Sequence, residues 1–114
     1  IDPQFRPTPV THININSLIG IVHQTTTTVT TTLTQLPSYG VLDNRRSLIF
    51  YNNDSSNIVY IGGSTVTSLN GLPIDAKSFS PSFDSGPLQK WYGVTASGTA
   101  DVRTIELSDE SSGR

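Results

Sequence analysis

The chain has 114 residues, no cysteine, a formal net charge of -2 and only 14% charged residues. This length suits one domain with a single hydrophobic core, and the lack of cysteine excludes disulfides and thiolate metal sites. The basic residues are scattered, and no apolar run approaches the ~20 residues that cross a bilayer. We therefore expect neither a nucleic-acid partner nor a membrane partner.

The first segment, residues 1–16, reads IDPQFRPTPVTHININ and is rich in proline. Proline fixes φ and removes a backbone donor, so this density opposes both a helix and a central strand. The sequence predicts an extended N-terminal arm that docks on another subunit, with a disordered terminus as the alternative. The candidate contacts of this arm are Phe5, Arg6 and Val10.

A threonine-rich segment, GIVHQTTTTVTTTLTQL, follows at residues 20–36. Ile21, Val29 and Leu33 share one parity, and alternate residues of a strand face the same side. The branched Cβ of threonine also packs well on a pleated surface. The segment predicts one long strand or two short ones with a thin apolar face, followed by a turn at 36–40. A glycosylated low-complexity stalk is the alternative.

Two runs of strand-forming residues, SLIFYNN and NIVYIGG, occupy residues 47–63 with the loop DSSN between them. This pattern predicts a β-hairpin with a long loop. Both runs are apolar on both parities, which predicts that each strand is covered on two sides, either by a second sheet and a flanking segment or by a neighbouring subunit. The candidate subunit contacts on these strands are Ile49, Tyr51 and Tyr60.

The remaining segments continue the strand pattern. STVTSL at 64–69 predicts a short strand, and Asn70-Gly71 predicts a turn because both residues tolerate positive φ. In the next segment, LPIDAKSFSPSF, Pro81 indicates a sheet edge. A second hairpin is expected between Trp91–Thr95 and Val102–Leu107, around ASGTA.

These short strands, with turn signals every 8 to 12 residues and no helical period, predict an all-β fold. We expect an antiparallel β-sandwich, jelly-roll or Ig-like, with about seven to nine strands. The sandwich domain is predicted over residues 17–108, between the arm and a polar C-terminal tail at 109–114.

Residue types that carry chemistry are present without a recognisable arrangement. His12 and His23 lack a third metal ligand at useful spacing, since the nearest acids in sequence are Asp2 and Asp43. Hydroxyl groups are abundant but have no identifiable base, and there is no G-x-S-x-G elbow. YIGGST lacks the lysine of a phosphate loop, so Gly62-Gly63 is interpreted as a bend. We expect no enzyme activity, no metal and no cofactor.

Trp91 and Tyr92 allow two interpretations. A tryptophan beside a tyrosine can form a platform for sugar rings, which would make the chain a carbohydrate-binding module. Trp91 can instead fill the core of a strand that otherwise has only Val94 of comparable size. The core interpretation is the favoured one.

The stretch NRRSLIFYNNDSSNIVYIGGSTVTSLNGLPI and the later WYGVTASGTADVRTIEL resemble a pattern of small β-rich structural proteins in tailed-bacteriophage virions. The resemblance covers roughly residues 36–108. The matching residues are Arg45 or Arg46; Tyr60, Ile61, Gly62, Ser64 and Val66; Asn70, Gly71, Leu72 and Pro73; and Trp91, Tyr92, Gly93, Gly98, Val102, Arg103 and Glu106.

The resemblance implies a structural protein located in the virion. It implies a capsid decoration or cement protein that binds and stabilises the head lattice, or an accessory neck, tail or fibre protein. Its partners would be other virion proteins, such as the major capsid protein or neck and tail subunits. The two-sided apolar strands further predict a homo-oligomer, with a homotrimer or another small ring as the favoured form.

Overall fold

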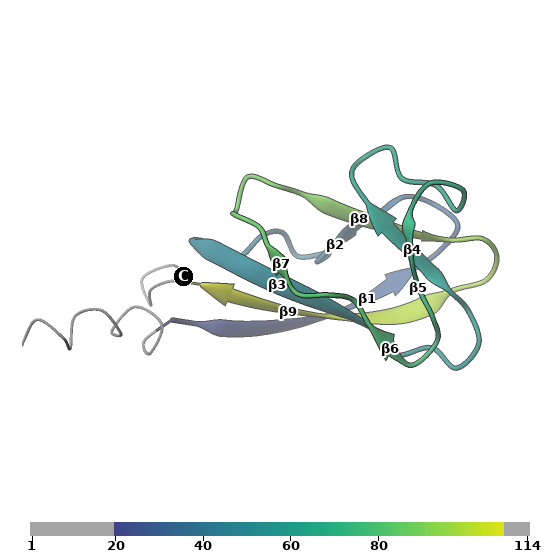
Figure 1. The fold of residues 1–114 in the computed structure, drawn as a ribbon, viewed down its shortest axis with the longest axis horizontal. Coiled ribbons are helices and arrows are strands. Elements are labelled where there is room, and N and C mark those ends of the chain that lie inside the picture. The colour runs from purple at the N-terminus through teal and green to yellow at the C-terminus, as the bar shows by residue number, and fades with distance from the viewer. Residues whose placement is uncertain (1–19, 109–114) are drawn as a thin grey trace, which may run out of the picture.

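The computed structural model describes residues 20–108, which form nine β-strands in two antiparallel sheets (Figure 1). The predicted all-β antiparallel sandwich is confirmed, as is the predicted number of strands. The predicted arm and tail lie outside the described residues. Phe5, Arg6, Val10 and His12 therefore have no described position.

Sheet A contains the strands nearest the two ends of the described chain. Its order is β1-β9-β3-β6, and β7 also pairs with β3. The bounds are β1 Val22–Val29, β3 Arg45–Asn52, β6 Ser78–Phe79, β7 Phe83–Asp84 and β9 Ala100–Ser108. The predicted edge position of the segment around Pro81 is confirmed, because β6 and β7 flank this proline at the edge beside β3.

Sheet B packs over sheet A and has the order β2-β8-β4-β5. Its bounds are β2 Thr34–Leu36, β4 Val59–Gly62, β5 Leu72–Ile74 and β8 Trp91–Thr95. Among the described connections, only β4–β5 and β6–β7 stay within one sheet. This repeated change of sheet, with β1 beside β9 and β2 beside β8, is the strand order of a jelly roll rather than of an Ig domain.

Both predicted hairpins are wrong, because β3 and β4 lie in different sheets, as do β8 and β9. The β3–β4 connection is held by side chains that take the place of ladder bonds. Asn52 Nδ2 donates to the carbonyls of Asn57 and Ile74, at 2.7 and 2.9 Å, and so joins sheet A to β5 of sheet B. Asp54 Oδ2 accepts the backbone N–H groups of Ser56 and Asn57, which curls the loop away from β3.

The β8–β9 connection is closed in a similar way. Thr95 Oγ1 donates to the Gly98 carbonyl at 2.7 Å, and Gly98 has φ +70°. Asn57 Nδ2 donates to the Thr99 carbonyl at 2.8 Å, so the two cross-sheet loops support each other. A sequence pattern of strand, polar loop and strand does not distinguish such a crossing from a hairpin.

The threonine-rich segment forms two strands, the eight-residue β1 and the three-residue β2, which agrees with the predicted alternative of two strands. The buried parity of β1 is the predicted one, but Thr25 and Thr27 fill it together with Val29. Leu33 lies between β1 and β2 and is exposed rather than part of that face.

The core lies between the sheets and is built from inward-facing residues of six strands. Its buried members are Val29, Leu36, Leu48, Phe50, Val59, Ile61, Ile74, Ala100 and Val102. Phe83 and Trp91 pack against this cluster while partly buried. The Trp91 ring centroid lies 5.6 Å from that of Phe50 and 4.5 Å from that of Phe83, so the core interpretation of Trp91 agrees with its packing.

The outer face of β4 is covered by the chain itself. Residues 63–71 form turns rather than the predicted strand at 64–69, with Val66 N–H donating to the Gly63 carbonyl. Val66 is only 7% exposed, and it packs against Gly62 and Gly71. A Cβ on Gly71 would lie 2.8 Å from Tyr60 Cβ, so the absence of a side chain at Gly71 lets the backbone of the loop pack closely against β4. The predicted turn at Asn70-Gly71 is confirmed, since both N–H groups donate to the Thr67 carbonyl, although neither residue has a positive φ.

Candidate functional site

The outer face of sheet A carries a continuous row of apolar side chains, which we call the sheet A stripe. The strand register places Val22 opposite Leu107, Ile105 opposite Ile49, and Tyr51 opposite Phe79. The Tyr51 and Phe79 ring centroids are 4.6 Å apart. The stripe therefore consists of Val22, Ile49, Tyr51, Phe79, Ile105 and Leu107, and it crosses the sheet from β1 to β6.

The two ends of the stripe are its most accessible parts. Val22 is 64% exposed and Phe79 is 68% exposed, whereas the four residues between them are half-buried. An exposed aromatic ring held against a second ring is a fixed apolar knob that loses little entropy on contact with a partner. This arrangement suits protein–protein contact.

A polar cluster borders the stripe beside Tyr51. Arg103 Nη2 lies 3.1 Å from Asp101 Oδ2, and Asn53 Nδ2 donates to the same oxygen at 3.0 Å. Burial raises the pKa of Asp101, but the hydrogen bonds from Asn53 and Arg103 outweigh it and leave that pKa below its ordinary value. Lys77 Nζ reaches Asn53 Oδ1 at 3.1 Å, which extends the cluster to the β5–β6 loop.

The structure separates the residues predicted as subunit contacts. Ile49 and Tyr51 lie together in the sheet A stripe, whereas Tyr60 lies on sheet B, opposite Val94 and Pro73. The other stripe residues were not predicted as contacts. Alternation along β9 puts Ile105 and Leu107 on one face, but only the register with β3 places that face beside Ile49.

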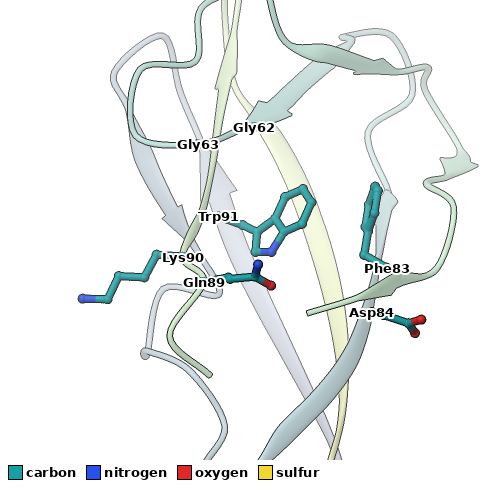
Figure 2. Close-up of a pocket in the computed structure, with 7 residues that line it drawn as sticks. All are labelled: Gly62, Gly63, Phe83, Asp84, Gln89, Lys90 and Trp91. Carbon is teal, nitrogen blue, oxygen red and sulfur yellow. The ribbon is translucent and has the colours of Figure 1, made fainter. Parts of the chain in front are cut away.

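A second candidate site is a hollow of about 290 Å³ at one end of the sandwich. Its lining residues are Gly62, Gly63, Phe83, Asp84, Gln89, Lys90 and Trp91. Figure 2 shows the rings of Trp91 and Phe83 side by side, with the Gln89 amide near the indole and the Asp84 and Lys90 side chains directed away. The two ring centroids are only 4.5 Å apart. The hollow thus has one aromatic wall made of two packed rings, with one neutral polar group beside it.

A buried ion pair fixes the loop that carries Gln89. Arg45 Nη1 and Glu106 Oε2 are 3.1 Å apart, and both side chains are 0% exposed. Arg45 also donates to the carbonyls of Ser85, Gly86 and Gln89. Because Ser85 Oγ accepts from Trp91 Nε1 at 3.0 Å, one guanidinium positions both the loop and the indole.

Glu106 has two further neighbours. Leu42 N–H donates to its Oε2 at 3.1 Å, and His23 Nδ1 lies 3.7 Å from its Oε1. His23 is partly exposed, as expected from the sequence. The ion pair itself was not foreseen, because nothing in the local sequence links Arg45 to a glutamate on the last strand; both residues appear only separately in the virion-protein resemblance.

Residues 20–108 hold no group of three or more His, Cys, Asp or Glu side chains arranged to bind a metal. This part of the chain also has no helix of the length and hydropathy needed to span a bilayer.

Comparison with protein-family models, curated proteins and solved structures finds no match to this chain. The features that bear on its function are therefore the sheet A stripe, the aromatic hollow and the sequence resemblance.

Proposed function

We propose that this chain is a structural protein of a tailed-bacteriophage virion, and specifically a capsid decoration or cement protein that binds the head lattice. The observation that carries the proposal is the sheet A stripe, with Val22 and Phe79 exposed at its ends. The resemblance of residues 36–108 to small virion proteins supports the location. An accessory place in the neck, tail or fibre is the alternative within the same class.

The stripe suits a protein whose work is contact. Contiguous apolar surface on a soluble domain marks an interaction site, and aromatic residues near the centre of an interface dominate binding energy. The packed pair of Tyr51 and Phe79, whose rings are tilted by 48°, is the expected anchor. The polar cluster of Arg103 and Asp101 beside it suits the rim of such an interface, where charged groups stay solvated.

Copy number in purified virions tests the proposed location. Quantitative mass spectrometry of whole particles is expected to find hundreds of copies for a decoration protein. A dozen copies or fewer would move the chain to the neck, tail or fibre. Absence of the chain from the particle would refute the virion proposal.

Binding to particles depleted of the chain tests the stripe. Phe79→Ala is expected to weaken binding about 30-fold, the effect of a hot-spot residue worth about 2 kcal/mol. Leu69→Ala is the matched control, because Leu69 is a 96% exposed apolar residue in the β4–β5 loop, away from the stripe. Equal binding of the two variants would show that the stripe is not the contact surface.

The aromatic hollow supports a second candidate function, binding of a carbohydrate. Its volume of about 290 Å³ lies at the lower end of ligand pockets, and aromatic walls with a few polar groups are typical of them. Trp91 is a poor test residue, because its packing on the core predicts a loss of about 3–5 kcal/mol for Trp91→Ala. Gln89→Ala should abolish glycan-array binding in a folded protein, whereas Asp84→Asn, whose side chain points away, should preserve it.

A further inference from the structure

Among residues 20–108, nothing gives the outer edge of β1 the usual protection of an edge strand. All eight residues of β1 pair in regular register with β9, from Val22 opposite Leu107 to Val29 opposite Ala100. Within residues 20–108, no strand pairs with the other edge of β1. Natural edge strands are shortened, bulged, or marked by charge or proline to prevent further pairing. The sequence VHQTTTTV has no charged residue, proline or glycine.

The backbone groups on this free edge can be assigned from one hydrogen bond. Ser108 N–H donates to the Ile21 carbonyl at 3.0 Å, so the backbone of Ile21 faces β9. In a regular antiparallel ladder the direction alternates along the strand. The unpaired N–H and C=O groups are therefore those of the even-numbered residues, which also have exposed side chains: Val22, Gln24, Thr26 and Thr28.

This edge is complementary to itself. A second β1, placed antiparallel about a two-fold axis at Thr25, sets Val22 opposite Thr28 and Gln24 opposite Thr26 of the second copy. Every free-edge group then finds a partner, which gives about eight new backbone hydrogen bonds. No charged side chain meets another across the pair. A shift by one residue would turn the core face of the second copy towards solvent.

Thr25 supplies an independent observation. Thr25 is 5% exposed, and its Oγ1 is buried with no hydrogen-bond partner in the part of the chain that the structure describes. Buried hydroxyls are normally satisfied. In the proposed register Thr25 faces Thr25 of the second copy in a non-hydrogen-bonded pair, where Cα atoms lie ~4.5 Å apart. Threonine pairs form hydrogen bonds at such positions, and a rotamer change that turns each Oγ1 towards the axis would allow this one to form. The Oγ1 of Thr104, opposite Thr25 on β9, is likewise buried without a partner among residues 20–108.

We propose that the β1 edge is a homodimer interface, in which two copies pair β1 with β1 and merge their A sheets into one continuous sheet. Antiparallel edge pairing closes at two copies and leaves no free β1 edge. It therefore differs from the trimer or small ring favoured by the sequence. The inference is independent of what the sheet A stripe binds, since it concerns the edge of the sheet and not its face.

Cysteine cross-linking of the full chain tests the register, because the native sequence has no cysteine. Thr25→Cys is expected to form a disulfide-linked dimer on mild oxidation, since the two thiols face each other at the axis. Thr27→Cys is the matched control: it has the same face and similar burial, but lies opposite His23 of the second copy. Equal cross-linking of the two variants would overturn the proposed register.

Light scattering of the full chain tests the dimer itself. We expect twice the chain mass for the native protein and for Thr26→Ser, which keeps the backbone donor. Thr26→Pro should give a folded monomer, since it removes an N–H that faces the free edge and not β9. A monomeric native chain would refute the proposal. If that monomer also had Val22, Gln24, Thr26 and Thr28 amides protected from hydrogen exchange, residues 1–19 would be the occupant of the edge.

Discussion

Removing the carboxylate of Glu106 should destabilise the fold more than any single surface charge change. In Glu106→Leu, the Arg45 guanidinium stays buried without its counter-ion, and Leu42 N–H loses its acceptor. Breaking one side of a buried pair costs about 3–5 kcal/mol. The carbonyls of Ser85, Gly86 and Gln89 still accept from Arg45 and keep the cost from rising further. We therefore expect a loss of about 4 kcal/mol.

Two companion variants separate charge from packing. Glu106→Gln keeps an acceptor for Leu42 N–H and should cost less than Glu106→Leu. Arg45→Met combined with Glu106→Leu should cost less than the sum of the two single changes, by about 2–3 kcal/mol, because neither charge is then left alone. The double variant should not regain native stability, because the loop carbonyls that Arg45 held lose their donor.

Urea denaturation followed by tryptophan fluorescence is a suitable assay, because Trp91 is the single tryptophan and is hydrogen-bonded to Ser85 in the same network. For a domain of this size, a loss of about 4 kcal/mol lowers the melting temperature by about 15–30 °C. The matched control is Arg103→Leu. Its ion pair with Asp101 has the same 3.1 Å separation, but the two side chains are 51% and 36% exposed.

The control variant should lose about 0–1 kcal/mol, the value of a surface pair. If Glu106→Leu lost no more than Arg103→Leu, burial of the ion pair would not determine its contribution, and our account of this network would be wrong.

Three further predictions concern the loops. Gly71→Ala should lower the free energy of unfolding by about 1–3 kcal/mol in urea denaturation, since a new Cβ would lie 2.7 Å from Val66 Cγ2. Gly63→Ala is the control and should change stability little, because a Cβ there has nothing within 4 Å. Equal losses for the two variants would contradict this packing. Asn52→Ala should cost about 2–3 kcal/mol, because the buried Ile74 carbonyl and the partly buried Asn57 carbonyl lose their shared donor, and a loss below about 0.5 kcal/mol would mean that the Asn52 link between the sheets is dispensable. The backbone N–H groups of Asn57 and Ser56 hold the pKa of Asp54 below its ordinary value of 3.8, so the stability that this carboxylate contributes is present above pH 3.8 and lost as pH falls through the folded pKa. Melting temperatures of Asp54→Asn should therefore fall less steeply than those of the native chain in that acidic range, and parallel curves would contradict the prediction.

Local patterns in the sequence identified most strands but not their partners. The alternation of Leu48 and Phe50 with Ile49 and Tyr51 located β3 and its two faces, because a strand's side-chain period is a local property. Which strand pairs with which depends on loop paths. The polar loop after Asn52 reads as a hairpin loop in sequence, and its role as a bridge between sheets depends on Ile74, which is remote in the chain.

The candidate surfaces were predictable only in part for the same reason. Ile49 and Tyr51 were recognised as excess apolar residues, but a stripe exists only where their neighbours in the sheet are also apolar, and Ile105 comes from the last strand. Covering of β4 by a flanking segment was one of the predicted alternatives, but the covering residue was not identified, because Val66 resembles a strand residue and instead packs over two glycines. The pairing of Arg45 with Glu106 likewise required the fold.

The pairing of β1 with β9 has a consequence for how the chain acquires its structure. Thr28 pairs with Asp101, which is far away in the sequence. Among the described strands, the only long one that pairs with β3 in sheet A is also β9. Sheet A therefore cannot be completed on the ribosome until β9 has emerged. Until then, β1 and β3 each lack the strand that lies between them. Contacts of such long sequence separation place the domain among slow folders, with times of milliseconds to seconds. Deleting only β9 should leave no folded remnant, since the strand that completes the sheet is also the one that organises it.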